Sequence, residues 1–257
     1  MENRKIDGVI FDWAGTTVDY GSFAPVQAFV EVFKHFGIEP TMEEVRKPMG
    51  MLKIDHIRTM LKMERITKCW QEKYGCVPAD DDAQKLYGHF EEKLLSILDR
   101  FADPKPGVVK TVQALRERGI VIGSTTGYND KMMEIVAPQA AKNGYEPGCM
   151  VTPDSVGGMG RPYPYMIFRN MEALKLPDVH RVIKVGDTIS DIKEGKQAGV
   201  ISVGVIVGSS QMGLTKEEYE ALSPEEKQEK CGKVKAEFLE AGADYVILNM
   251  EDLLKLI

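Results

Sequence analysis

The spacing of hydrophobic positions changes twice along this chain. Residues 6–11 form a short apolar run, which is typical of a buried strand. From about residue 24 to residue 101, apolar positions recur every three or four residues, and this spacing predicts amphipathic helices with no strand between them. Residues 103–107, Asp-Pro-Lys-Pro-Gly, then interrupt the pattern and are expected to form a linker.

After the linker, short apolar runs alternate with amphipathic segments. Strands are expected at 120–124, 150–151, 182–185, 202–207 and 245–248, and helices at 108–118, 131–143, 163–174, 189–198 and 252–257. The polar segment 215–241 is expected to form two helices that break near Ser223 and Pro224, and we assign it no function. Repeated β-α units with apolar strands indicate a parallel sheet that is covered on both faces. The predicted fold class is therefore α/β, with a Rossmann-like, doubly wound parallel sheet.

The helical segment interrupts this sheet domain directly after its first strand. We therefore expect two domains, an α/β core from residues 1–20 and 104–257 and an inserted all-helical cap from residues 21–103. The cap is expected to lie over the carboxyl ends of the strands, and its two connections to the core would act as hinges.

Composition narrows the possible partners and compartments. The formal net charge of -6 argues against nucleic acid or an anionic membrane as the main partner. No apolar stretch approaches the ~20 residues that span a bilayer, and no signal peptide is expected before the first strand. The four cysteines lack metal-binding spacing, so we expect reduced thiols in a cytoplasmic protein.

Four polar motifs fall at βα junctions, where ligands bind in open α/β sheets. Asp12 ends the first apolar run, and Gly15 lets the chain turn sharply after it. The other motifs are Ser124-Thr125-Thr126-Gly127-Tyr128, Gly160-Arg161-Pro162 and Gly186-Asp187-Thr188-Ile189-Ser190-Asp191. Each motif alone is a weak signal, because such residues are common in turns, in helix caps and on surfaces. Their ordered combination is specific, and it favours phosphoryl transfer.

Each motif has a physical role in such a reaction. Asp12 can attack phosphorus and form an aspartyl-phosphate. Thr126 and the Gly127 amide can bind phosphoryl oxygens, and Arg161 can stabilise the transferring group through bidentate bonds.

The same region is expected to hold a magnesium ion, which prefers hard oxygen ligands. The expected ligands are Asp12, Asp187 and the backbone carbonyl of Ala14. Asp191 lies four residues after Asp187 at a helix start, so it faces the same side and is expected just behind these ligands.

These motifs resemble those of the haloacid dehalogenase superfamily of aspartate-nucleophile phosphotransferases. Members usually carry Asp-x-Asp-Gly-Thr, then Thr or Ser, then Lys or Arg, then Gly-Asp with a further Asp. The chain matches this pattern at Asp12, Thr126, Arg161, Asp187 and Asp191. It departs at Ala14, where the second aspartate normally serves as acid and base, and this departure argues against an ordinary phosphate-ester phosphatase.

Longer segments resemble the phosphonoacetaldehyde hydrolase branch of that superfamily. They are residues 11–21, 46–56, 123–128, 160–164, 184–191 and 208–215. The resemblance spans essentially the whole chain, and Ala14 together with Lys53 is its most specific part. It implies cleavage of the carbon-phosphorus bond of phosphonoacetaldehyde to acetaldehyde and phosphate, in 2-aminoethylphosphonate degradation, by a homodimer.

In this branch, Lys53 replaces the missing acid. Attack on the phosphorus of a phosphonate must expel a carbanion, which an acid at position 14 would not assist. An imine between Lys53 and the aldehyde lets the carbon leave as a neutral enamine. A closing cap would remove water from Lys53, and this burial, together with the nearby Arg161, would lower its pKa from ~10.4.

Three further residues are candidates for this chemistry. If residues 49–57 are helical, Met49 and His56 share one face with Lys53. His56 can shuttle protons, Met49 can keep the amine dry, and Tyr128 can join the proton network. Taken alone, a helix lysine is usually solvated, and a histidine or methionine usually only packs. The base for aspartyl-phosphate hydrolysis stays open between Lys53 and His56.

Two other functions remain as alternatives. One is a phosphatase or phosphomutase of the same superfamily that acts on a small phosphate ester, with another group in place of Ala14. The other is a non-catalytic protein that binds a phospholigand. Retention of Asp12, Thr126, Arg161 and Asp187 argues against the loss of catalysis.

Overall fold

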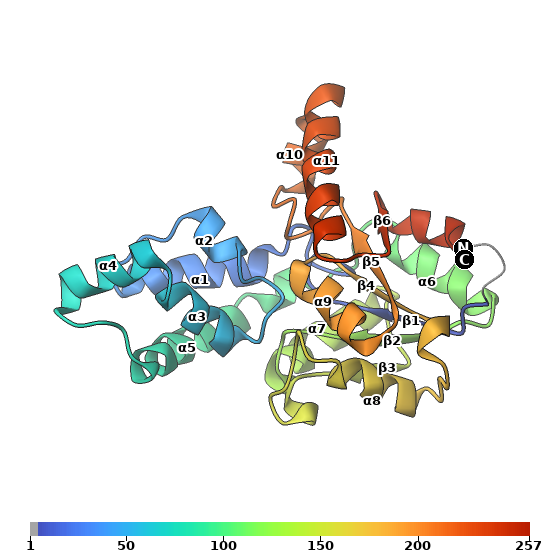
Figure 1. The fold of residues 1–257 in the computed structure, drawn as a ribbon, viewed down its shortest axis with the longest axis horizontal. Coiled ribbons are helices and arrows are strands. Elements are labelled where there is room, and N and C mark those ends of the chain that lie inside the picture. The colour runs from blue at the N-terminus through green and yellow to red at the C-terminus, as the bar shows by residue number, and fades with distance from the viewer. Residues whose placement is uncertain (1–4) are drawn as a thin grey trace.

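The computed structural model describes residues 5–257, so the expectation about a signal peptide falls partly on residues outside the described range. A six-stranded sheet forms the centre of the larger lobe (Figure 1), in the order β3-β2-β1-β4-β5-β6, and every neighbouring pair is parallel. The strands are β1 Gly8–Phe11, β2 Val121–Thr125, β3 Cys149–Val151, β4 Val182–Gly186, β5 Ile201–Val205 and β6 Tyr245–Ile247. The predicted doubly wound parallel fold is confirmed.

Helices cover both faces of this sheet, because the side chains of a strand alternate between its faces. Val9 and Phe11 of β1 share an apolar cluster with residues of α6 Val108–Glu117, α7 Asp130–Lys142 and the 3₁₀ helix η4 Met250–Lys255. Ile10 belongs to a second cluster with α8 Tyr165–Ala173 and α9 Ile189–Ala198. Short 3₁₀ turns, η2 Asp154–Val156 and η3 Val179–Arg181, precede α8 and β4.

The polar segment after β5 forms two helices, as predicted. They are α10 Lys216–Ala221 and α11 Pro224–Glu240, and α11 stands out from the core in Figure 1. Ser223 caps α11 through the amide of Glu226, and Pro224 occupies its first turn, where a missing N–H costs nothing. The last helix begins earlier than expected, because Asn249 and Asp252 form a capping box ahead of residue 252.

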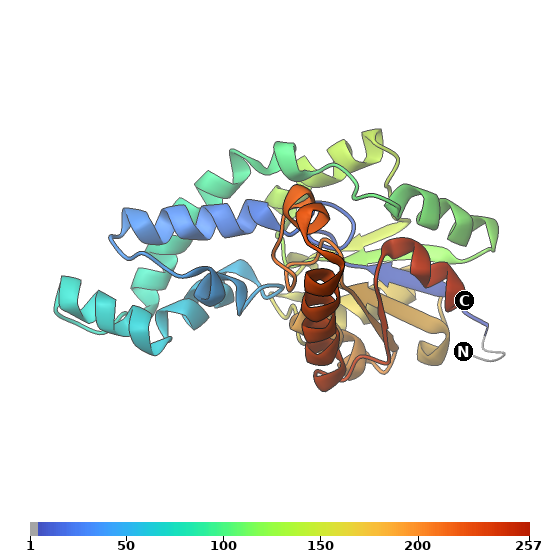
Figure 2. The same cartoon turned by 90° about the horizontal axis from the view of Figure 1, so that it is seen from above.

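A separate helical lobe follows β1. It contains α1 Phe23–His35, α2 Met42–Arg46, α3 Lys53–Leu61, α4 Glu64–Tyr74, α5 Asp80–Leu95 and the 3₁₀ helix η1 Leu98–Phe101. Figures 1 and 2 both show it beside the sheet layer rather than within it. Phe29 of α1 stacks on Phe90 of α5, with ring centroids 4.2 Å apart, so the expected helical faces pack against each other. Helices without strands between them were predicted here; the bounds 21–103 for a domain stay a prediction.

The two connections between the lobes run side by side. The amide of Lys105 donates to the carbonyl of Thr17 at 2.8 Å, and Val18 forms a bridge with Pro104. The first connection turns sharply, with Asp19 and Ser22 in the left-handed region at φ 51° and 54°. The Asp19 carboxylate then accepts bonds from the amides that start α1, which fixes the direction in which the helical lobe departs.

Candidate functional site

Strand β1 delivers Asp12 to the point where the strand order reverses, between β1 and β4. The Asp12 amide still donates to Val185 of β4 at 2.9 Å, and the chain turns immediately afterwards. Gly15 has φ 88°, and a Cβ there would lie 2.0 Å from Asp187 Oδ2. Only glycine therefore permits the turn that brings these two carboxylates together.

Both lobes line one small cavity beside Asp12. Its volume is about 20 Å³, and its lining residues are Asp12, Ala14, Ser22, Met49, Gly50, Lys53, Thr126, Gly127, Tyr128, Arg161, Asp187 and Thr188. The structure thus brings together nine of the eleven candidate residues; His56 and Asp191 stand outside the lining. A space of this size holds about one water molecule.

Two glycines allow the lobes to approach this closely. A Cβ at Gly127 would lie 2.9 Å from the carbonyl oxygen of Met51, and one at Gly50, where φ is 86°, would lie 2.3 Å from Thr188 Oγ1. Ser190 Oγ also donates to the carbonyl of Met49 at 3.3 Å. The segment that precedes α3 is therefore seated directly on the core.

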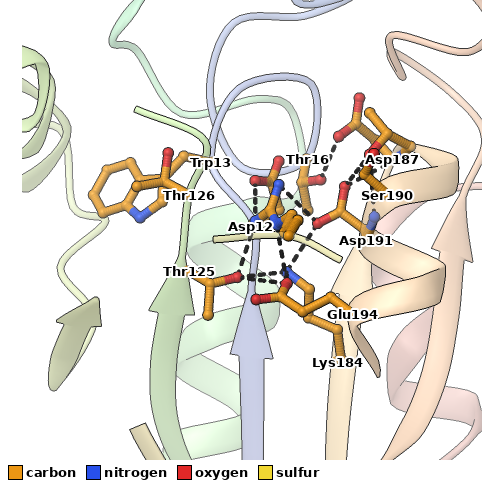
Figure 3. Close-up of polar contacts among 12 residues, drawn as sticks. Asp12, Trp13, Thr16, Thr125, Thr126, Lys184, Asp187, Ser190, Asp191 and Glu194 are labelled. Atoms are coloured by element: carbon orange, nitrogen blue, oxygen red, sulfur yellow. Dashed lines mark hydrogen bonds and ion pairs between the residues drawn. The ribbon is translucent and has the colours of Figure 1, made fainter. Parts of the chain in front are cut away.

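Arg161 is the electrostatic centre of the site, and Figure 3 labels the three carboxylates that it contacts, Asp12, Asp191 and Glu194. Its side chain is 1% exposed, and it contacts three carboxylates: Asp12 at 2.6 Å, Asp191 at 3.1 Å and Glu194 at 2.9 Å. Burial alone would lower the pKa of Arg161, but these carboxylates, Asp12 first, raise it above its usual value. The guanidinium is therefore a permanent positive charge beside the Asp12 carboxylate.

A second buried cation, Lys184, was missed by the sequence reasoning. Figure 3 shows it rising from β4 toward Thr125 and Glu194, and its Nζ lies 2.9 Å from Asp191 Oδ1, 3.2 Å from Glu194 Oε2 and 2.8 Å from Thr125 Oγ1. A lysine inside the apolar run of β4 was an available signal, because an unpaired lysine is almost never fully buried. Glu194 lies one turn after Asp191 on the same helix, so its position in the sequence could have indicated a carboxylate partner for Lys184.

The aspartates can hold a divalent metal ion. One oxygen each from Asp12, Asp187 and Asp191 lies within 4.8 Å of the others. Asp187 accepts bonds from Thr16 Oγ1 at 3.0 Å and from the Ser210 amide at 2.7 Å. Burial first, and then the charges of Asp12 and Asp191, raise the pKa of Asp187 well above its usual value. A cation between these carboxylates would relieve that repulsion, so the donor set fits a metal.

Asp191 differs from the other two aspartates because it forms ion pairs with two buried cations. Oδ2 accepts a bond from Thr188 Oγ1 at 2.6 Å, while Oδ1 faces Arg161 and Lys184. These cations contribute to a lowered pKa of Asp191, against the opposing effect of burial. This arrangement suits a residue that stands behind the metal ligands rather than among them.

Lys53 begins α3 and points its amine into the cavity. It is 4% exposed, and burial lowers the pKa of Lys53 to about 8, with Asp12 opposing this shift and Arg161 adding to it. Its Nζ lies 5.2 Å from the ring centroid of Tyr128, whose hydroxyl has no hydrogen-bond partner among residues 5–257. At neutral pH this lysine therefore provides far more free amine than a solvated one.

His56 lies one turn further along α3 and faces the interior of the helical lobe. Its ring stacks on Phe29 with centroids 3.8 Å apart, and neither ring nitrogen has a partner in the described part of the chain. Burial, with a contribution from the Lys53 charge, lowers the pKa of His56 well below its usual value. The imidazole is therefore neutral, and a role as proton shuttle stays a prediction.

Thr126 has a geometry that suits anion binding. Its Oγ1 accepts a bond from the Tyr128 amide at 3.0 Å, which leaves the hydroxyl hydrogen free to be donated into the cavity. The neighbouring Gly127 has no side chain of its own that could block approach to its amide.

Known proteins are similar to this chain in sequence and in fold. The family model of the haloacid dehalogenase-like hydrolases matches residues 6–199. A phosphonoacetaldehyde hydrolase from Lysinibacillus sphaericus is 55% identical over 249 residues, which cover 97% of this chain and 93% of that protein. The chain belongs to the haloacid dehalogenase-like hydrolases, in the phosphonoacetaldehyde hydrolase family.

Two further relatives extend this assignment. A bifunctional phosphonoacetaldehyde hydrolase/aminoethylphosphonate transaminase from Clostridioides difficile is 54% identical over 97% of this chain, which spans 39% of that longer protein. The crystal structure of a phosphonoacetaldehyde hydrolase-like protein from Oleispira antarctica has a TM-score of 0.95 at 38% identity, and the match covers 98% of this chain and 91% of that one. This haloacid dehalogenase-like hydrolase is therefore similar to members of its family in both lobes. In the part of the chain that the structure describes, no helix is long and apolar enough to cross a membrane, and all four cysteines are free.

Proposed function

We propose that this enzyme hydrolyses phosphonoacetaldehyde to acetaldehyde and phosphate. The observation that carries the proposal is the position of a buried lysine with a depressed pKa across a shared cavity from Asp12, while position 14 offers no acid. The names of the relatives support the substrate. The transaminase half of the Clostridioides difficile protein supports a place in 2-aminoethylphosphonate degradation.

The reaction starts at Lys53. Its unprotonated amine attacks the aldehyde carbon, and loss of water gives a protonated imine. Asp12 then attacks phosphorus, the carbon-phosphorus bond breaks, and its electron pair is taken up as the imine becomes an enamine. Protonation of the enamine carbon and hydrolysis of the resulting imine release acetaldehyde and return the free amine. Water finally attacks the aspartyl-phosphate, with Lys53 or His56 as the base.

Other residues bind and shield the reacting groups. The Thr126 hydroxyl, the Gly127 amide and Arg161 hold the phosphoryl oxygens, because these donors converge on the same cavity as Asp12. Met49 closes the cavity on its helical side and keeps water from the amine. Tyr128 lies beside Lys53 and passes protons during imine formation.

We propose Mg²⁺ as the metal, held by the carboxylates of Asp12 and Asp187 and by the Ala14 carbonyl, with Asp191 behind them. When bound, the ion would neutralise charge on the phosphoryl oxygens. We also propose that residues 21–103 act as a mobile cap on a core of residues 1–20 and 104–257. Free cysteines support a cytoplasmic enzyme, and family resemblance supports a homodimer.

Product analysis with matched variants tests the proposal. The wild-type enzyme is expected to release equal amounts of acetaldehyde and phosphate from phosphonoacetaldehyde, and Lys53→Arg to release neither. Lys62→Arg, an exposed lysine beyond the end of α3, is the control and is expected to behave as wild type. Release of phosphate from simple phosphate esters, undiminished in Lys53→Arg, would instead establish an ordinary phosphatase.

A further inference from the structure

One arginine of the helical lobe reaches into the core. Arg46 is the last residue of α2, and its Nη1 donates to the carbonyl of Gly21 at 2.9 Å and to the carbonyl of Ser210 at 3.0 Å. Its guanidinium carbon lies 4.9 Å from the ring centroid of Phe23. Arg46 therefore binds the helical lobe, the first connection and a core loop at a single point.

That core loop also binds a metal-ligand candidate. Ser210 is buried, and while its carbonyl accepts a bond from Arg46, its amide donates to Asp187 Oδ2 at 2.7 Å. Further along the loop, a Cβ at Gly213 would lie 3.0 Å from Arg46 Nε, so the loop approaches the arginine closely. One residue thus links the guanidinium of Arg46 to the carboxylate of Asp187.

Arg46 is also connected, through the chain segment that follows it, to the amine of Lys53. Six residues lie between Arg46 and Lys53, and the core holds this segment at Met49, whose carbonyl accepts the bond from Ser190. The position of the Lys53 amine relative to Asp12 therefore depends on how this short segment is seated. Arg46 and Met49 are the points on either side of Pro48 where it is held.

Arg46 is unlike the other arginines of the same helical segment. Arg58 is partly exposed and Arg65 is exposed, and they pair with carboxylates of their own lobe, Asp80 and Glu44. Arg46 instead binds main-chain carbonyls, and its buried Nη2 has no hydrogen-bond partner anywhere in residues 5–257. A partly buried guanidinium at a junction between lobes, with one nitrogen fully buried and unpaired, is expected to be sensitive to whether that junction is closed.

We propose that Arg46 is a positioning residue that couples closure of the helical lobe to metal binding at Asp187. Asp187, when it holds a metal ion, would have its carboxylate fixed, and with it the Ser210 residue whose amide it accepts and whose carbonyl Arg46 binds. Metal binding would thereby favour the closed arrangement in which the Lys53 amine shares the cavity with Asp12. Coupling is reciprocal, so closure strengthens metal binding by the same factor. The consequence for Lys53 rests on the proposed function, whereas the coupling itself does not.

The test is the affinity of the full chain for Mg²⁺, measured by calorimetry without substrate. Arg46→Gln is expected to weaken Mg²⁺ binding about 5- to 10-fold. Arg46→Lys, which keeps the charge but loses the planar fork, is expected to restore part of the affinity. Arg58→Gln removes a partly exposed arginine of the same lobe that pairs only within that lobe, and it is expected to bind Mg²⁺ as wild type does. Mg²⁺ is also expected to slow proteolytic cleavage near residues 19–22 in the wild type and in Arg58→Gln. It is expected to have no such effect in Arg46→Gln.

Unchanged Mg²⁺ affinity in Arg46→Gln or, if that variant does not fold, in Arg46→Lys would overturn the coupling. Borohydride trapping of an imine on Lys53 separates this proposal from the proposed function. A wild-type enzyme that binds Mg²⁺ but forms no imine contradicts the function and leaves the coupling to be decided by the Mg²⁺ measurements alone. An enzyme that forms the imine, with Mg²⁺ binding indifferent to Arg46, contradicts only the coupling.

Discussion

The pKa of the Lys53 amine can be measured without turnover of a phosphonate substrate. Acetaldehyde carries no phosphoryl group, so the rate at which borohydride traps its imine on Lys53 reports how much free amine is present. Burial lowers the pKa of Lys53 to about 8, from an ordinary 10.5. At pH 7 the free fraction is then about 10%, against about 0.03% for an ordinary lysine, roughly a 300-fold difference. The trapping rate is expected to rise with pH, to reach half its maximum near pH 8 and to level off above about pH 9.

Lys105 provides an internal control for this assay. Burial also lowers its pKa to about 8. However, its Nζ donates to the carbonyls of Gly15, Val207 and Gly208, so the amine is held away from an incoming aldehyde. Mass spectrometry of the trapped protein is expected to show an adduct on the Lys53 peptide and none on the Lys105 peptide. Equal labelling of both would mean that acidity alone, rather than the cavity, selects the lysine.

The Asp12→Asn variant tests the direction in which the Asp12 charge shifts the pKa of Lys53. The Asp12 charge raises the pKa of Lys53 against the effect of burial, so its removal is expected to lower that pKa further. The inflection of the trapping profile should therefore move to lower pH than in the wild type. An inflection near pH 10.5 in the wild type, or a shift to higher pH in Asp12→Asn, would refute the reasoning.

Three further changes have expected outcomes. The pKa of Lys53 is about 8 in the folded protein and 10.5 in an unfolded chain, so keeping this lysine protonated destabilises the fold below pH 8. Lys53→Met is therefore expected to raise the free energy of unfolding, measured in urea at pH 7, by up to ~3 kcal/mol. This gain is expected to shrink as the pH rises from 8 to 10.5, because the wild-type lysine then loses its proton. Glu194→Gln leaves Lys184 with less compensating charge and is expected to destabilise the fold by about 3 kcal/mol in the same assay. Gly127→Ala places a methyl group 2.9 Å from the Met51 carbonyl, so it is expected to slow imine trapping at least tenfold while thermal melting changes little, because it obstructs closure and not folding.

The core fold could be predicted because its signals are local. A parallel strand that is buried on both faces must be apolar, as β1 is, and a polar residue at its end then marks the edge where ligands bind. Asp12, Thr126 and Asp187 were found in this way, and the structure places all three on the same cavity. Helix caps are also local signals: Ser223 and Pro224 correctly predicted the break between α10 and α11.

The missed residues act through partners that are distant in sequence. Lys105 lies in a Pro-Lys-Pro linker, where composition indicates an exposed side chain, yet it is buried because backbone carbonyls from two loops converge on it. Arg46 likewise binds the carbonyl of Ser210, 164 residues away. A carbonyl is present at every residue, so no residue type in the sequence marks it as the partner of a buried cation. Such contacts follow from the arrangement of the loops, which hydrophobic spacing does not determine.

His56 shows a different limit of periodicity. The helical spacing predicted that His56 shares one face of α3 with Lys53. The two side chains are one turn apart, yet only Lys53 reaches the cavity, while His56 lies in the interior of the helical lobe. Lys53 lines the cavity, while the His56 ring stacks on Phe29. The same burial that keeps the imidazole neutral also removes the water that would carry a proton from it. A role for His56 in the reaction therefore requires water to reach a ring that packs on Phe29 inside the helical lobe, and separation of the two lobes alone does not expose that ring.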